Sequence, residues 1–193
     1  MGRHLWLIVI LAVVILFVSS GVNTIPTLDE KVKASWAEVQ NQYQRRTDLI
    51  PNLVESVKGY ANFEQKTLTD VIEARASATK VTLSPEMLSD PNAMKNFEQA
   101  QGNLSSALSR LMVTVEKYPD LKANQNFLAL QSQLEGTENR ITIARKDYIE
   151  TVQGYNTTVR TFPGVIWAMI YGAKAKQTFT ATEGSDKPPA VKF

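Results

Sequence analysis

Large apolar side chains recur along most of this chain at alternating intervals of three and four residues. That spacing lines them up on one side of an α-helix and is typical of helices that pack in a bundle. It is most regular near the start of the chain, where the seam positions are Trp36, Val39, Tyr43, Arg46, Ile50, Leu53, Val57 and Tyr60. The pattern therefore predicts a long helix from about residue 28 to residue 59.

Pro51 lies inside this predicted helix. Proline lacks the N–H that would bind the carbonyl of Thr47, and its ring clashes with that carbonyl. The chain could stop at Leu49 and restart, or it could continue as a kinked helix. Because the apolar spacing keeps its phase from Ile50 to Leu53, we expect the kink.

Three further helices are predicted by the same spacing. They cover residues 64–81, about 94–118 and about 120–160. Asp90 followed by Pro91 is typical of a helix start, because an aspartate side chain can cap the first turn and proline fits its first position. This pair indicates where the third helix begins.

The chain is thus predicted to be all-α. Residues 28–172 are expected to form an antiparallel, up-down bundle of four long helices. The apolar segment at 165–172 would add a short C-terminal helix. Residues 173–193, with glycine, serine and two prolines near their end, predict a flexible tail.

The N-terminus is the most hydrophobic part of the chain. Residues 5–18 are 14 uninterrupted apolar residues, and with residues 19–22 the run reaches 18. A membrane span takes ~20 residues, with ~17 as the lower end, so the run fits a short transmembrane helix or a signal peptide. Trp6 suits a membrane interface. We therefore expect an uncleaved anchor over residues 1–22, joined to the bundle by a linker at 23–27.

The charges around this anchor indicate an orientation. Arg3 precedes the apolar run, and the next basic residue after it is Lys31. Basic residues favour the cytoplasmic side of a membrane. The expected topology is a single-pass protein with a cytoplasmic N-terminus, the bundle on the outer side, and bilayer lipid around residues 5–22.

Composition excludes several classes of function. The 193 residues carry 21 Lys+Arg and 19 Asp+Glu, without a basic tract that would favour nucleic acid. The absence of cysteine excludes disulfides and thiolate metal sites. The single histidine is His4, so the bundle cannot hold a histidine-dependent active site or the Glu-x-x-His motif of di-iron bundles. We expect no catalytic residue, no metal, no cofactor and no nucleic-acid partner.

Polar residues interrupt the apolar seams or lie among alanines on all four predicted helices. They are Arg46, Arg75, Gln101, Glu138 and Arg145. Arginines at the edge of a seam can extend their charged heads into water. A second interpretation is a buried layer in which Arg46 or Arg75 pairs with Glu138 and fixes the register of the helices. A third is a ligand-binding or catalytic layer.

A polar patch surrounds the predicted kink. It comprises Asp48, Pro51, Asn52, Glu55 and Lys58. These residues form either a solvated helix face or a surface for docking a partner, where carbonyls freed by the proline add contacts.

The C-terminal apolar helix is a second candidate surface. In an up-down bundle the fourth helix returns to the end where the first one leaves the membrane. Trp167, Ile170 and Tyr171 would then enter the membrane interface, with Lys174 and Lys176 at the headgroups. Alternatively, the segment closes the end of the bundle.

Several long stretches resemble the LemA family. They are Ala34-Ser35-Trp36, RRTDLIPNLVESVKGY at 45–60, Glu64, Ala74-Arg75-Ala76, ENRITIARKDYIETVQGYN at 138–156, and Phe162-Pro163. The resemblance extends over nearly the whole chain, from the anchor to Gly172. It implies a bacterial single-pass membrane protein that carries an antiparallel bundle of long helices, and it implies no established enzyme activity.

These observations predict a non-enzymatic, membrane-anchored protein of the bacterial envelope. It would be a helical rod at the inner membrane, on the periplasmic side, acting as a scaffold or binding partners. The partner would be an unidentified envelope or membrane protein, and self-association into a homo-oligomer stays open. The alternative is a sensor or adaptor in envelope-stress signalling, in which the kink permits two helix packings.

Overall fold

The computed structural model describes residues 5–60 and 64–180. Over these residues the chain is helical and contains no strand, which confirms the all-α prediction. The elements are α1 (Leu5–Gly21), α2 (Thr24–Lys58), α3 (Gln65–Lys80), the 3-10 helix η1 (Pro85–Ser89), α4 (Pro91–Val115), α5 (Pro119–Lys122), α6 (Gln125–Arg160) and α7 (Gly164–Tyr171).

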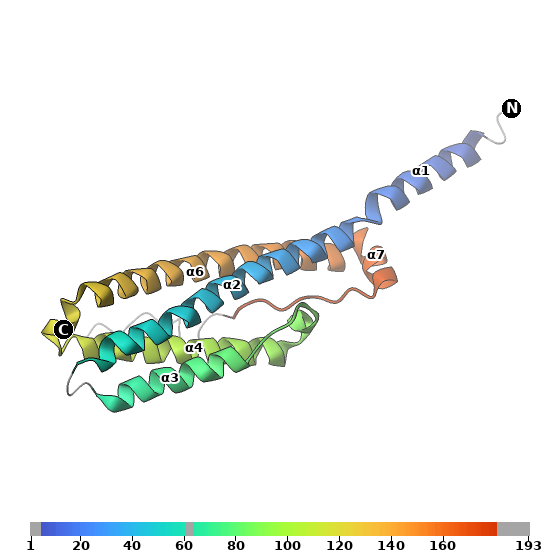
Figure 1. The fold of residues 1–193 in the computed structure, drawn as a ribbon. Helices are drawn as coiled ribbons and strands as arrows, with labels where there is room; N and C mark the ends of the chain where they lie inside the picture. The colour runs from blue at the N-terminus through green and yellow to red at the C-terminus, as the bar shows by residue number, and fades with distance from the viewer. Residues whose placement is uncertain (1–4, 61–63, 181–193) are drawn as a thin grey trace, which may run out of the picture.

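The four long helices are arranged as two packed pairs (Figure 1). α2 packs along α6, and α3 packs along α4. Successive long helices run in opposite directions, as an up-down bundle requires. α7 lies at the end of the bundle where α2 begins, and α1 continues from there away from the bundle.

The core consists of two clusters of buried side chains. The cluster nearer to α7 is rich in aromatic residues, and these include Trp36, Tyr43, Phe97, Tyr148, Tyr155 and Phe179. The cluster at the other end is mostly aliphatic, and it includes Ile50, Leu53, Leu104, Leu111, Phe127 and Leu134. In the aromatic cluster the Trp36 ring lies 5.2 Å from the rings of both Phe97 and Tyr148. Such ring pairs add to the stability gained from burial alone.

α2 passes through Pro51 without a break. The proline leaves the carbonyl of Thr47 without its usual helical donor. Arg75 on α3 replaces that donor, because its Nε donates a hydrogen bond to the Thr47 carbonyl over 2.9 Å. The continuity of α2 is therefore supported from a neighbouring helix.

Two element boundaries differ from the predicted ones. α2 begins at Thr24, so most of the linker expected at 23–27 is helical. Pro26 permits this because it lies in the first turn, where a missing N–H breaks no helical bond. The helix expected at 120–160 is interrupted, since the side chain of Asn124 caps α6 by accepting bonds from two backbone N–H groups of its first turn.

Residues 173–180 do not form part of a flexible tail. They are extended and run along the bundle (Figure 1). The side-chain amide of Asn156 binds both the carbonyl and the N–H of Lys176, each over 2.8 Å. The N–H of Gln177 donates to the carbonyl of Leu88 over 2.7 Å. The segment is thus fastened to α6 on one side and to η1 on the other.

Phe179 anchors this extended segment in the aromatic cluster. Its ring lies 5.6 Å from that of Tyr148 and 6.1 Å from that of Trp36. The guanidinium carbon of Arg145 lies 4.3 Å from the ring centre, a cation–π contact. The Tyr148 hydroxyl donates to the carbonyl of Gln177 over 2.9 Å.

α1 comprises 17 residues, and its described apolar side chains are exposed. Among the residues that the structure describes, no helix combines the length and the hydropathy needed to cross a membrane. The predicted transmembrane helix is therefore not supported. Residues 1–4 of the expected anchor and residues 181–193 of the expected tail lie outside the described residues.

Replacing Phe179 with alanine tests whether the extended segment belongs to the core. Truncating a buried phenylalanine typically costs ~3–5 kcal/mol of unfolding free energy. We expect that loss for Phe179→Ala, measured by denaturant unfolding of the full chain with circular dichroism. Ile143→Ala on α6 is the control, because Ile143 is 59% exposed and its loss should change stability by less than ~0.5 kcal/mol. Equal effects of the two changes would contradict the anchoring role.

Candidate functional site

A buried polar layer separates the two core clusters, and Arg46 is its centre. The Arg46 side chain is 1% exposed. Its Nη1 donates to Glu138 over 2.9 Å and to the hydroxyl of Ser105 over 2.8 Å. Its Nη2 donates to the side-chain oxygen of Gln101 over 2.6 Å. The guanidinium also lies 5.0 Å from the ring centre of Tyr43.

These bonds join three helices, since Arg46 belongs to α2, Gln101 and Ser105 to α4, and Glu138 to α6. A buried ion pair adds little net stability, but removing one partner leaves an uncompensated group and costs several kcal/mol. The Glu138 side chain is 44% exposed, so water also solvates it. The layer thus fixes how the helices align more than it adds to their overall stability.

The other residues of the predicted layer have different roles. Among the described residues Arg75 forms no ion pair with Glu138, and its Nε donates to the Thr47 carbonyl instead. Arg145 stacks on Phe179 and lies beside Tyr43. Burial raises the pKa of Tyr43, and the positive charges of Arg145 and Arg46 act in the opposite direction.

An open groove lies over this layer, between α4 and α6. Its volume is about 710 Å³, and its lining includes Arg46, Lys95, Glu98, Gln101, Glu138 and Arg145. A second hollow continues it toward the aliphatic cluster and is lined by Leu108, Met112 and Leu134 among others. Ser105 and Glu138 line both hollows, so the two are parts of one groove.

The predicted partner patch is an exposed strip on α2. All five of its residues, Asp48, Pro51, Asn52, Glu55 and Lys58, are exposed. Lys58 pairs with Glu55 over 2.8 Å, and Asp48 accepts a hydrogen bond from Gln44 over 2.7 Å. None of these five residues lines the groove over the polar layer.

The three residues predicted at the membrane interface differ in their exposure. Trp167 is only 8% exposed and packs against Gly21, leaving no room there for a side chain. Trp167 therefore packs within the core cluster nearer to α7. Ile170 is 66% exposed and Tyr171 46% exposed. The Tyr171 hydroxyl donates to the carbonyl of Val22 over 2.9 Å, which ties α7 to the base of α1.

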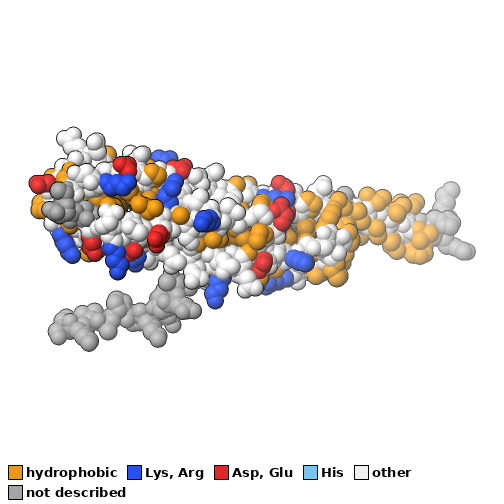
Figure 2. All heavy atoms as spheres, turned by 60° about the horizontal axis from the view of Figure 1, so that its bottom comes forward, with side chains coloured by type: hydrophobic (Ala, Val, Ile, Leu, Met, Phe, Trp, Pro, Cys, Tyr) orange, Lys and Arg blue, Asp and Glu red, His pale blue; other side chains and the backbone are white. Residues whose placement is uncertain are grey.

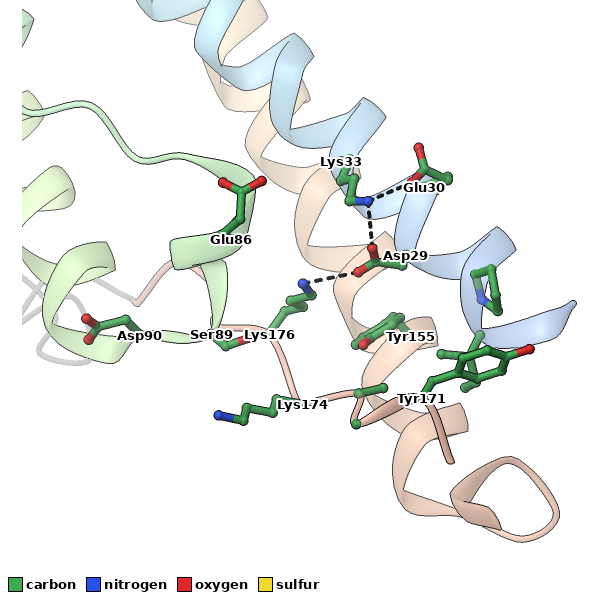
Figure 3. Close-up of a pocket in the computed structure, with 14 residues that line it drawn as sticks. Asp29, Glu30, Lys33, Glu86, Ser89, Asp90, Tyr155, Tyr171, Lys174 and Lys176 are labelled. Atoms are coloured by element: carbon green, nitrogen blue, oxygen red, sulfur yellow. Dashed lines mark hydrogen bonds and ion pairs between the residues drawn. The ribbon is translucent and has the colours of Figure 1, made fainter. Parts of the chain in front are cut away.

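A charged pocket lies at the same end of the bundle (Figure 3). Asp29 sits between Lys33 and Lys176, at 3.0 and 3.1 Å, and Lys33 also binds Glu30. Burial alone would raise the pKa of Asp29, but the hydrogen bonds from the two lysines outweigh it and lower that pKa. Across the described residues, no group of three or more carboxylate or histidine side chains could hold a metal ion.

Lys176 links the extended segment to α2, a contact that the spacing of residues did not predict. Nothing in the local sequence around Asp29 indicates a partner so far along the chain. The one available signal for the segment was Phe179, a lone aromatic residue in a polar stretch. The groove between α4 and α6 was also not predicted.

Comparison with known proteins shows the family of the chain. The LemA family matches residues 35–193. The chain belongs to the LemA family. Its relatives include Magnetosome protein MamQ 2 of Paramagnetospirillum magneticum and Magnetosome protein MamQ of Magnetospirillum gryphiswaldense, each 26% identical over 182 residues, which covers 86% of this chain and 67% of the relative. Protein LemA of Metamycoplasma hominis is 24% identical over 124 residues, covering 64% of this chain and 52% of the relative.

The match confirms the family resemblance that the sequence predicted. It begins inside α2, so the polar layer, the groove and residues 173–180 all lie within the part of the chain that matches the LemA family. α1 and the charged residue Asp29 precede that part.

Arg46→Ala tests the polar layer. Removing this buried cation should lower the unfolding free energy of the full chain by ~3–5 kcal/mol, because Gln101 and Glu138 lose their shared donor. Arg75→Ala is the matched control, since it removes a single hydrogen bond at a partly exposed site and should cost ~1–2 kcal/mol. Denaturant unfolding measures both. A cost for Arg46→Ala no larger than that of Arg75→Ala would rule out the central role of Arg46.

The Asp29 pocket predicts a dependence on pH. A carboxylate whose native pKa is lowered contributes stability above its unfolded pKa of about 4, and that contribution disappears as the pH falls through the native value. The unfolding free energy should therefore fall more steeply below about pH 4 in the native chain than in Asp29→Asn. Unfolding curves from neutral to acidic pH provide the measurement, and parallel pH profiles would refute it.

Proposed function

We propose that this LemA-family chain is a membrane-associated protein of the bacterial envelope that has no enzyme activity and binds partners through its bundle. The observation that carries the proposal is the apolar end of the molecule. There, the exposed apolar side chains of α1 and those of α7 meet, held together by Trp167 against Gly21 and by the Tyr171 bond to Val22.

The distribution of side chains over the surface supports this proposal. Figure 2 shows hydrophobic side chains covering α1 and the adjoining end of the bundle, whereas Lys, Arg, Asp and Glu are spread over the bundle itself. Met169 and Ile170 of α7 are 73% and 66% exposed. Fully burying such a side chain gains ~1.5–3 kcal/mol, so α7 would add to whatever lipid contact residues 5–22 make.

The proposed arrangement has the bundle standing on the membrane by this end, on the periplasmic side of the inner membrane. Binding surfaces then lie along its sides. The strip formed by Asp48, Pro51, Asn52, Glu55 and Lys58 on α2 and the groove between α4 and α6 are both open to a partner. The two MamQ relatives described above are named magnetosome proteins.

The membrane contact of α7 can be measured in vesicles. The chain contains no cysteine, so a single introduced one gives a unique site for a polarity-sensitive dye. In the full chain reconstituted in vesicles, a dye at Ile170→Cys should emit at shorter wavelength and be quenched by lipids with brominated acyl chains. Val113→Cys is the control, because Val113 is equally exposed, at 68%, but lies near the far end of α4. Identical emission and quenching at the two sites would defeat the proposal.

A further inference from the structure

The gap between α4 and α6 is a consequence of how the helices pair. α2 packs on α6 and α3 on α4, while α4 and α6 have few contacts with each other. Different groups fill this gap along its length. The extended residues 173–180 occupy the end near α7, and the Arg46 layer crosses the middle. Beyond residue 180 the gap continues as the open groove.

The filled end shows how the gap holds an extended chain. Several side chains bind the backbone of the segment, as Asn156 does at Lys176 and Tyr148 does at Gln177. One aromatic side chain, Phe179, is inserted between the helices. The segment meets α4 where Glu98 accepts bonds from the N–H and the hydroxyl of Thr180.

The open groove offers the same kinds of groups. Amide and hydroxyl side chains that can bind a peptide backbone line its rim, and they include Gln99, Ser105, Ser109, Gln131, Asn139 and Thr142. Its far end is apolar, with Leu108, Met112 and Leu134. This combination suits an extended polypeptide that places one or more apolar side chains at the far end.

The charges of the groove differ along its length. Near Thr180 the lining carries Arg46, Arg145 and Lys95 against two carboxylates, and both of these are engaged, Glu98 by Thr180 and Glu138 by Arg46. Arg145 and Lys95 form no ion pair with a carboxylate in the described part of the chain.

The position of the remaining acid in the groove also favours an anionic occupant at this end. The one other acid that lines the groove is Glu135, at the apolar end, where it accepts a bond from Gln131. Guanidinium groups bind carboxylates in a bidentate, charge-assisted way, so a carboxylate beside Arg145 would be favoured.

We propose that the groove between α4 and α6 binds an extended acidic segment of another protein, with a carboxylate at Arg145 and Lys95 and an apolar side chain at Leu108, Met112 and Leu134. Arg145 and Leu134 lie eleven positions apart on α6. That is about 16 Å along a helix, or about five residues of extended chain. The recognised sequence therefore has an Asp or Glu and a large apolar residue about five positions apart.

This inference rests on the partner-binding part of the proposed function and not on its membrane part. If the dye at position 170 reports water while peptides still bind, the membrane contact fails and the groove stands. If the dye reports lipid while no peptide binds, the opposite holds.

A random dodecapeptide library displayed on phage, selected against the full chain in vesicles, tests the proposal. We expect enriched peptides to share the acidic and apolar pair at that spacing. For a fluorescent synthetic copy of one enriched peptide, Arg145→Gln and Lys95→Gln should each weaken binding by about tenfold. Because Lys95 is exposed, Lys95→Gln should leave the fold intact, so weaker binding by this variant cannot result from misfolding. Met112→Gln should weaken binding at the apolar end. Arg140→Gln, an exposed arginine on α6 outside the groove, should leave binding unchanged.

Three outcomes would overturn the proposal. Enriched peptides could lack the acidic residue, or binding could be insensitive to both Arg145→Gln and Lys95→Gln. Binding could appear only when the chain is truncated after Thr180, which would make its own residues 181–193 the occupant. Peptide binding that is abolished when the chain self-associates at higher concentration would assign the groove to a second copy.

Discussion

The buried guanidinium of Arg46 is the constraint on which the bundle depends. α2 pairs with α6 and α3 pairs with α4. A further contact must therefore fix the position of one pair relative to the other. Arg46 binds α4 and α6 at once, through Gln101 and Glu138. A charged group inside a core tolerates few alternative positions, because each one would leave it without acceptors. The aromatic cluster therefore forms on one side of this residue and the aliphatic cluster on the other.

A second polar bond between helices compensates for Pro51, which lies about one turn beyond Arg46 on α2. Pro51 deprives Thr47 of a helical donor, and Arg75 on α3 supplies one. An arginine and a proline look least suited to a helical seam, and they mark two places where polar groups bond α2 to other helices. Apolar packing holds these helices together, and the polar bonds select one alignment among several that apolar packing alone would allow.

Much of this arrangement could be predicted from the sequence, and the reasons are local. Intervals of three and four residues identify the long helices, and the in-phase positions of Arg46, Gln101 and Glu138 make a shared buried layer one of three interpretations. The placement of residues 173–180 could not be predicted, because most of their bonds are made by the backbone and leave no periodic pattern. Trp167 lies in an apolar run where every position looks equally suited to lipid or core, so only the packing against Gly21 distinguishes it. The groove depends on which helices pair, and the spacing of residues within one helix contains no such information.

The way Asn156 holds the extended segment has a consequence for how this part of the chain can vary. The side-chain amide of Asn156 binds only the backbone of Lys176, and Gln177 is likewise bound through its backbone N–H and carbonyl. Neighbouring side chains can then be exchanged with little penalty, apart from the ionic contact of Lys176. A change of length has a larger effect, because side chains alternate between the two sides of an extended chain. One residue added or deleted between Lys176 and Phe179 would turn the Phe179 ring away from the core. Apart from Phe179 and Lys176, a change of length in this segment should therefore cost more than a change of residue type.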